Sequence, residues 1–354
     1  MTRTVVVFSP VYYRHDPGRG HPESARRLHA IINELNSTEF VASGKVQYVQ
    51  PMRADIEDAK LVHDIEYIKH IESFCISGGG LLDLGDTVAS PETYRVALHA
   101  VGGILRAVDL VMDGKFQNAF ALVRPPGHHA GRFTACGFCI FNNVAIAAQY
   151  LLRKFKLKKI LILDVDAHHG NGTQEIFYDT SKILYISLHE DPRGFPGTGF
   201  IDEIGEGEGL GYKVNIPLPF KTGDQIYEEA MEDVVTPIVN QYRPQFILVS
   251  AGFDSHYTDP VGSLALSASC HQKTYDTIIK LASKNSNGRL VSVLEGGYSL
   301  RFVGKLATAM IATMSGERFF VKDDVPRTRQ QVARQSRRIM REVKKAQSAY
   351  WNLS

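Results

Sequence analysis

Short runs of consecutive apolar residues recur along the chain, and each leads within a few residues into ionisable side chains. The clearest runs cover residues 120–123, 160–163, 246–250 and 290–294. A continuous apolar run of this length is typical of a strand that is buried on both faces, as in a parallel sheet. Strands of this kind that alternate with helices predict an α/β fold. Because open α/β sheets bind ligands at the carboxyl ends of their strands, the residues after each run are candidates for a functional site.

The densest group of ionisable residues follows the run at 160–163. Asp164, Asp166, His168 and His169 all lie within six residues. Asp166 and His168 are two residues apart, so in an extended segment both point to the same side and can reach one cation. Four such side chains would be hard to accommodate at the edge of a sheet without a cation. We therefore predict a metal site here.

Asp254, which follows the run at 246–250, offers a third ligand from another strand end. Two carboxylates and one imidazole leave a tetrahedral zinc ion with one open position, which is typical of catalytic rather than structural zinc. Taken alone, Asp254 would favour another interpretation, because acidic residues at strand ends often cap the next helix or pair with an arginine. The cluster after residues 160–163 is what favours the metal site.

Two further strand ends carry candidate catalytic groups. After the first run, a Pro-Pro-Gly turn precedes the adjacent His128 and His129. Proline restricts the backbone and glycine allows a sharp path, so both rings can be held in place for acid and base chemistry. After the last run, Gly297 allows close approach of the backbone to a ligand and is followed by Tyr298. Taken alone, a tyrosine at such a turn is more often a packing residue than a catalyst.

These segments together carry a resemblance to a known family. The chain resembles the superfamily of histone deacetylases and acetylpolyamine amidohydrolases, zinc enzymes, in its class II-like branch, through the motifs RPPGHHAG, LDVDAHHGNGTQ, SLHEDPRGFPGTG, SAGFDSHYTDP and EGGYS. The similarity spans roughly residues 1–315, and its motifs are long and specific. It implies an arginase-like, three-layer α/β fold with a central, mostly parallel sheet of about eight strands flanked by helices.

The resemblance implies one Zn²⁺ ion per chain, held by Asp166, His168 and Asp254. Binuclear manganese enzymes of the same fold need an aspartate where this chain has Gly170, so one zinc ion, or an iron ion in the same site, is expected. The resemblance also implies two sites for structural K⁺ or Na⁺ ions, bound mostly through backbone carbonyls. The first would use Asp164, Asp166, His168, Ser187 and Leu188, and the second Phe177, Thr180, Ile183 and Tyr212.

Catalysis would depend on the histidine pair and the tyrosine. By resemblance, His129 is the general base and then the general acid in hydrolysis by a metal-activated water, and His128, oriented by Asp164, is its electrostatic partner. Tyr298 would donate a hydrogen bond to the amide carbonyl and then to the oxyanion. Some family members carry a second aspartate behind the other histidine, where this chain has Asn171. A neutral partner stabilises the imidazolium less than a carboxylate does, so we expect a lower pKa for His129.

The resemblance also implies a narrow tunnel for an acyl-lysine side chain. Phe138 and Phe195 match its two aromatic walls, although the sequence alone would also allow both to be core residues. Asp86 matches a rim residue that holds the substrate backbone, and Arg27 an arginine below the metal, beside the acetate exit. The expected substrate-binding residues are Phe138, Phe195, Gly137, Asp86, Arg27 and Gly297.

The expected function is that of a zinc-dependent deacetylase that hydrolyses the amide of N-acetyl-lysine in peptides or proteins. Two alternatives stay open: a deacetylase of small acetylated amines such as acetylpolyamines, and a non-catalytic acyl-lysine binding module. Every catalytic position is filled, which favours an enzyme over a binding module. The stretch GGGLLDLGDTVASP shows no insertion of the kind that narrows the entrance of dedicated polyamine enzymes, which favours lysine.

The end of the chain differs in charge from the rest. Residues 321–354 hold nine Lys or Arg against three Asp or Glu, in a chain with a net charge of +2. Such a tail can bind nucleic acid or an acidic partner. Against this, its apolar residues recur at helical spacing and predict an amphipathic helix docked on a catalytic domain of residues 1–320, with the basic face in water. We therefore do not expect nucleic-acid binding. The apolar positions are Val332, Ile339, Val343, Ala346 and Tyr350.

The remaining features fit a soluble cytoplasmic enzyme. The apolar stretch at residues 5–8 is too short for a signal-peptide core, and no run reaches the roughly twenty residues that span a bilayer. Four cysteines do not make a disulfide framework, and Cys136 and Cys139 lack a second pair to complete a structural zinc site. The expected partners are acetylated peptides, proteins or small amines and no membrane, while homo-oligomerisation stays open.

Overall fold

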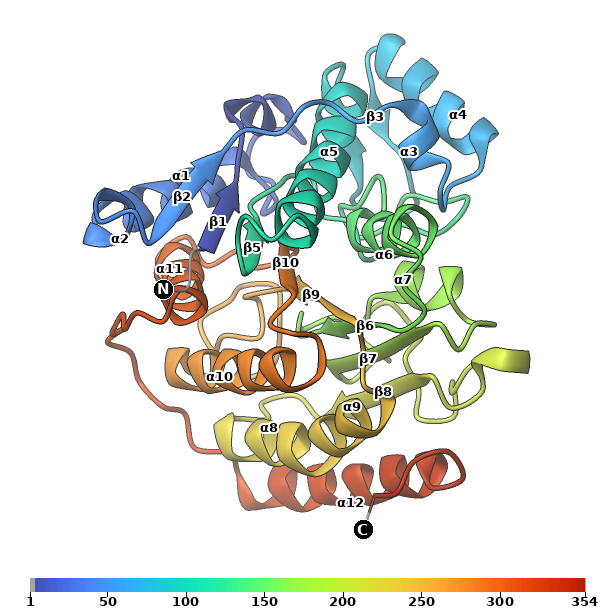
Figure 1. The fold of residues 1–354 in the computed structure, drawn as a ribbon, viewed down its shortest axis with the longest axis vertical. Helices are drawn as coiled ribbons and strands as arrows, with labels where there is room; N and C mark the ends of the chain where they lie inside the picture. Colours follow the sequence, from blue (N-terminus) through green and yellow to red (C-terminus); the bar gives the residue numbers. More distant parts are fainter. Residues whose placement is uncertain (1–3, 354) are drawn as a thin grey trace.

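The structure is a computed structural model and describes residues 4–353. The protein is built around one sheet of eight parallel strands. Their order is β2-β1-β5-β10-β9-β6-β7-β8 (Figure 1). The prediction of an α/β fold with a central, mostly parallel sheet of about eight strands is confirmed. The strands are β1 (Thr4–Val7), β2 (Val46–Val49), β5 (Asn118–Ala121), β6 (Ile160–Asp164), β7 (Ile183–Glu190), β8 (Lys213–Leu218), β9 (Phe246–Ala251) and β10 (Leu290–Leu294).

Helices cover both faces of the sheet. They are α1 (Ala25–Asn36), α2 (Glu39–Ala42), α3 (Ile56–Ala59), α4 (Ile65–Ile76), α5 (Thr93–Met112), α6 (Asn143–Lys154), α7 (Asn171–Ile176), α8 (Asp224–Ala230), α9 (Thr236–Tyr242), α10 (Ala268–Asn285), α11 (Val303–Ser315) and α12 (Gln330–Gln347). Helices α5 and α6 pack on one face, while α1, α10 and α11 cover the other (Figure 1). Shorter elements are the helical turns η1 (Pro10–Arg14), η2 (Gly207–Gly209) and η3 (Met231–Val235) and a hairpin of β3 (Gly80–Leu81) and β4 (Val88–Ala89).

The two helical layers explain the apolar runs of the sequence. Every residue of β5, β6, β9 and β10 is buried, so neither face of these strands is exposed to solvent and their apolar residues need not alternate with polar ones. The same four strands are neighbours in the sheet, in the order β5-β10-β9-β6. Because parallel strands end at one edge, the polar segments that follow them meet there, as is usual for ligand sites in open α/β sheets.

Helix α12 packs against β8 and α8 at the outer end of the sheet (Figure 1). Of the five apolar positions expected to face the protein, Val343 is fully buried, whereas Tyr350 is 41% exposed. The buried stripe instead includes polar residues that bond to neighbouring segments. Ser336 lies 3.2 Å from the Thr222 hydroxyl, and Gln347 Nε2 donates to the carbonyl of Lys213 at 2.9 Å. The rotation of α12 about its own axis is therefore set both by hydrogen bonds and by the burial of apolar side chains.

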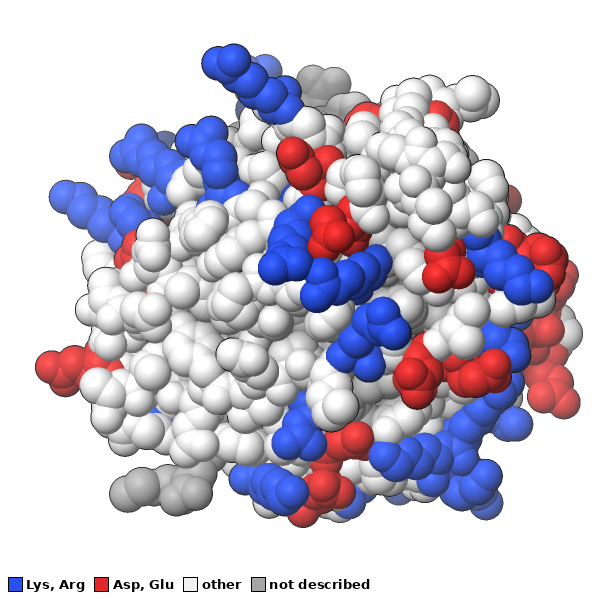
Figure 2. Space-filling view, turned by 90° about the horizontal axis from the view of Figure 1, so that it is seen from above, with Lys and Arg blue, Asp and Glu red and all other residues white. Residues whose placement is uncertain are grey.

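The surface carries charges of both signs. Figure 2 shows one face, on which Lys and Arg side chains lie beside Asp and Glu, and wide areas carry neither. The described part of that face is therefore not a continuous basic surface of the kind that tracks a nucleic-acid backbone. None of the helices within residues 4–353 is both long and apolar enough to cross a lipid bilayer.

Candidate active site

Three candidate metal ligands, which we call the ligand group, meet where β6 and β9 end. Asp166 and His168 follow β6, Asp254 follows β9, and their ligand atoms lie within 4.8 Å of one another. His168 Nδ1 is 3.3 Å from Asp166 Oδ1 and 3.0 Å from Asp254 Oδ2. A Cβ at the neighbouring Gly296 would lie 2.3 Å from Asp254 Oδ2 and 2.6 Å from Asp166 Oδ2. Only glycine leaves the ligand group its room.

The chemistry of the ligand group fits a single zinc ion. Two carboxylates and an imidazole are a common donor set for divalent zinc. Burial raises the pKa of Asp254 to about 7, and the like charge of Asp166 adds to the shift. A divalent cation would offset both effects. A Cβ at Gly170, where a second metal would need an aspartate, would lie 2.4 Å from Asp164 Oδ2 and 2.7 Å from the Tyr185 hydroxyl. The backbone there has no space for a further ligand.

His128 and His129 lie beside the ligand group on the segment after β5. Their ring centroids are 3.9 Å apart. The Nδ1 atoms have different partners: that of His128 is 3.0 Å from Asp164 Oδ2, and that of His129 is 2.8 Å from Asn171 Oδ1. His128 Nε2 lies 3.9 Å from Asp166 Oδ1. Each ring is thus fixed from behind, one by a carboxylate and one by an amide.

The two histidines differ in their electrostatic surroundings. Burial disfavours the charged form of both, but at His128 the carboxylates of Asp164 and Asp166 outweigh burial and raise the pKa to about 10. At His129, burial and the positive charge of His128 hold the pKa well below its usual value. His128 therefore favours the charged form at neutral pH and His129 the neutral form, which is the form a general base needs.

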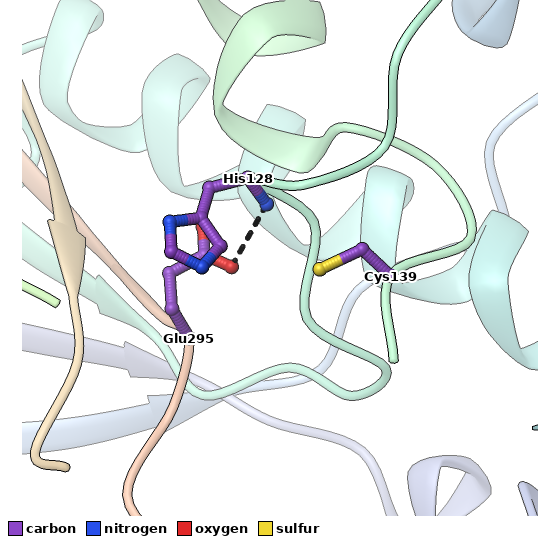
Figure 3. A group of neighbouring side chains, drawn as sticks. All are labelled: His128, Cys139 and Glu295. Carbon is purple, nitrogen blue, oxygen red and sulfur yellow. Dashed lines mark hydrogen bonds between the residues drawn. The ribbon is translucent and has the colours of Figure 1, made fainter. Parts of the chain in front are cut away.

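A buried carboxylate, Glu295 at the end of β10, supports the histidine turn from below (Figure 3). Its Oε2 accepts hydrogen bonds from the main-chain N–H groups of Gly127 at 2.7 Å and His128 at 3.1 Å, and its Oε1 from the Ser250 hydroxyl at 3.2 Å. The sulfur of Cys139 points toward the same place, and ligand atoms of Cys139, His128 and Glu295 lie within 4.8 Å. Burial raises the pKa of the Cys139 thiol well above its usual range. A protonated thiol beside an already bonded carboxylate favours structural support over metal binding.

A cavity of about 340 Å³ leads to the ligand group and the histidines. Phe195 and Phe138 both line it: the Phe195 ring lies 5.0 Å from that of His129, and the Phe138 ring 5.7 Å from that of Tyr298. A Cβ at Gly137 would lie 2.5 Å from the His129 ring, so this position also bounds the cavity. The lining residues are Asp86, His129, Gly137, Phe138, His168, Glu190, Gly194, Phe195, Val261 and Tyr298.

Tyr298 reaches the cavity from the glycine-rich turn after β10. Its main-chain N–H donates to Asp259 Oδ2 at 2.6 Å, and the Arg27 guanidinium lies 4.8 Å from the centre of its ring. Arg27 Nε donates to the carbonyl of Gly297 at 2.7 Å. Arg27 and Gly297 are not among the lining residues of this cavity, and the hydrogen bond between them holds the turn that carries Tyr298; their predicted roles in substrate binding stay predictions.

The residues expected at two monovalent ion sites lie in two places. Those of the first site lie along the ends of β6 and β7, which pair in register through Asp164 and Ser187. Those of the second site run from the end of α7 to the start of β8. There, Lys213 Nζ donates hydrogen bonds to the carbonyls of Thr180, Ile183 and Tyr212.

Several residues of the site were missed from the sequence. Glu190, at the end of β7, and Glu295, at the end of β10, follow the same strand-end pattern that revealed the other candidates, so the signal was present. Val261, Gly194 and Asp259 lie in loops, where no local pattern marks them.

Comparison with known proteins agrees with the geometry. The model of the histone deacetylase domain family matches residues 21–314. A probable deacetylase of Archaeoglobus fulgidus is 38% identical over 357 residues, which cover 98% of each chain. The histone deacetylase-like amidohydrolase of Pseudomonas aeruginosa is 35% identical, over 85% of this chain and 78% of its own. A crystal structure of the HDA15 HD domain has a TM-score of 0.89 at 33% identity and covers 99% of this chain and 95% of its own.

Zinc dependence is typical of this family, and the ligand group offers a matching donor set. The family match extends over most of the chain, and the relatives align with it at 35–38% identity. The chain therefore belongs to the histone deacetylase family and is a hydrolase of that family.

Proposed function

We propose that the protein hydrolyses the amide of N-acetyl-lysine in peptides or proteins, with one zinc ion held by the ligand group. The observation that carries this proposal is the cavity, whose apolar walls of Phe138, Phe195 and Val261 lead to His129 and Tyr298 beside the ligand group. Such walls suit the methylene chain of lysine, and the polar groups at the bottom suit its amide.

The residues divide the chemistry between them. When bound, zinc supplies Lewis-acid polarisation of the amide carbonyl and activates water. His129 takes a proton from the attacking water and later gives it to the leaving nitrogen. His128, kept charged by Asp164, stabilises the negative charge that develops on the substrate, and Tyr298 donates a hydrogen bond to the same oxygen.

A deacetylase of small acetylated amines is the second candidate, and Glu190 favours it. A carboxylate in the cavity wall would attract the additional ammonium group of an acetylated polyamine. Glu190 is already engaged, however: its Oε2 accepts the main-chain N–H of Ser263, and its Oε1 lies 3.8 Å from His168 Nε2. We therefore give acetyl-lysine precedence.

Turnover on a matched panel tests the proposal. The zinc-loaded enzyme is assayed for kcat/KM on acetyl-lysine peptides of varied flanking sequence and on mono-acetylated putrescine and spermidine. We expect the highest kcat/KM on peptides. Higher values on the polyamines would replace the proposal with the second candidate, and binding without turnover of either class would identify a non-catalytic module.

Replacing Tyr298 by phenylalanine should lower kcat by about a hundredfold or more, because it removes one donor to the oxyanion. Zinc content and the circular dichroism spectrum should stay as in the wild type. Tyr257→Phe is the matched control, since the Tyr257 hydroxyl lies outside the cavity lining and accepts the main-chain N–H of Asp324 at 3.3 Å. Near-wild-type turnover of Tyr298→Phe on an acetyl-lysine peptide would remove this role.

Replacing Asn171 by aspartate should move the acidic limb of the pH profile of kcat/KM to higher pH. A carboxylate at 2.8 Å from His129 Nδ1 favours the imidazolium and so raises the pKa of His129. The base then stays protonated up to a higher pH and is competent only above it. Asn171→Ala, which adds no charge, is the comparison. An unchanged limb, or one displaced to lower pH, would show that position 171 does not control the protonation of His129.

A further inference from the structure

A lysine side chain is buried where the outer edge of the sheet meets the loop after α7. Lys213, the first residue of β8, has no exposed surface. Its Nζ donates to three main-chain carbonyls, those of Thr180 at 3.0 Å, Ile183 at 3.1 Å and Tyr212 at 3.2 Å. Within residues 4–353, no carboxylate lies within ion-pair distance of it, and Asp179 favours its charged form only from farther away. The carbonyl dipoles are therefore its main compensation for lost water.

The arrangement of acceptors favours the charged form of the side chain. An ammonium group has three N–H donors and no acceptor, which matches three converging carbonyl oxygens. A neutral amine has only two N–H groups, and its lone pair would face the third oxygen. Burial lowers the pKa of Lys213 to about 7, although the charge of the Asp179 carboxylate acts in the opposite direction. The three carbonyls oppose this shift, because they bond best to the charged form.

The C-terminal segment closes this place from outside. The Gln347 side chain of α12 donates to the Lys213 carbonyl at 2.9 Å, and Trp351 Nε1 donates to the Gly211 carbonyl at 2.7 Å. The rings of Trp351 and Tyr212 lie 5.5 Å apart, edge to face. The ammonium group is thus enclosed between β8, the loop after α7 and the chain end.

We propose that the Lys213 ammonium group is a built-in cation that takes the place of a bound monovalent metal ion at this loop. The resemblance of the chain implies such an ion on the carbonyls of Phe177, Thr180, Ile183 and Tyr212. Three of these four carbonyls are bonded to Nζ, and the fourth, that of Phe177, accepts the Thr180 N–H at 3.3 Å. An ion and the ammonium group cannot share the same oxygens, so these residues do not fit the ion.

An ammonium group in place of a bound ion makes the stability of this loop independent of the K⁺ or Na⁺ concentration. A free ion leaves its site when its concentration falls, because occupancy follows mass action. A tethered ammonium group is present at a fixed, high effective concentration. The loop between α7 and β7 should therefore keep its structure without K⁺ or Na⁺, independently of which acetylated substrate the enzyme uses.

Comparison of Lys213→Ala with the wild type tests the proposal. Melting temperatures are measured in KCl and in choline chloride of equal ionic strength. Choline is the control cation because it is too large to bind among the carbonyls of Thr180, Ile183 and Tyr212. In choline, Lys213→Ala should melt about 5 °C or more below the wild type, because three hydrogen bonds to a charged group are lost. KCl should restore a large part of that loss, and the gain should exceed any gain of the wild type. A variant as stable as the wild type in choline would overturn the proposal.

Crystals soaked in RbCl locate the ion directly. We expect an anomalous Rb⁺ peak among the carbonyls of Thr180, Ile183 and Tyr212 in Lys213→Ala and none there in the wild type. A Rb⁺ peak at this place in the wild type, with Lys213 displaced, would refute the proposal without any variant.

Two further variants separate charge from packing. Lys213→Met keeps the stem but has no donor and leaves no room for an ion, so it should lose stability in both salts without rescue by K⁺. Full stability of Lys213→Met would count against a role for the charge. Lys182→Ala removes an exposed lysine next to the same loop and should match the wild type throughout.

Discussion

Replacing Asp254 by alanine should abolish activity together with the bound zinc. Asp254 is the one member of the ligand group that comes from β9, so its loss leaves two ligands from a single segment. Loss of an outer partner of a ligand typically weakens metal binding about 10–100-fold, and loss of a ligand should cost more. Metal analysis of the purified protein gives its zinc content, and competition with a chromogenic chelator gives its affinity for zinc. The wild type should hold one zinc ion per chain.

Asp254→Asn separates the metal from the fold. The amide keeps the shape and the acceptor for the Ala167 N–H, which bonds to Asp254 Oδ1 at 2.9 Å, but it removes the charge. We expect a folded protein with weakened zinc binding. A fully metallated and active Asp254→Ala would remove Asp254 from the ligand group, and two tightly held ions in the wild type would contradict a mononuclear site.

Replacing His129 by alanine should reduce kcat by about a thousandfold, within the range that general acid-base groups contribute. His129 can act as the base because it is neutral: burial and the charge of His128 hold the pKa of His129 low, so the ring can accept a proton. Zinc content should not change, because His129 lies outside the ligand group. Single-turnover assays on an acetyl-lysine peptide, with zinc measured in the same samples, check both points.

His128→Ala should keep measurable activity, because a charged His128 acts on the electrostatics of the transition state and not as the base. His70→Ala is the matched control, since His70 is exposed on α4. If His129→Ala stayed within tenfold of the wild type while His128→Ala was inactive, the roles of the two rings would have to be exchanged.

Local patterns were sufficient for four of the eight strands, β5, β6, β9 and β10, and for much of the candidate site. Residues 160–163, and residues 290–294 apart from Ser292, could be recognised because strands buried on both faces hold few polar side chains. The spacing of Asp166 and His168 is a property of one extended segment, so it too is visible in the sequence. Residues that lie in loops, such as Val261, have no such periodicity, and the sequence did not reveal them.

The sequence by itself determined the α/β class, the strand ends as the place of the chemistry and the residue types gathered there. Tertiary structure alone decided which of those ends meet, because strand order depends on pairing between segments far apart in the chain. It brought Glu295 under His128, and Gly296 against Asp254 and Asp166. It also placed the Lys213 ammonium group against main-chain carbonyls of the loop after α7. The energy of this contact depends on burial and on the direction of the hydrogen bonds, and no local sequence pattern records either.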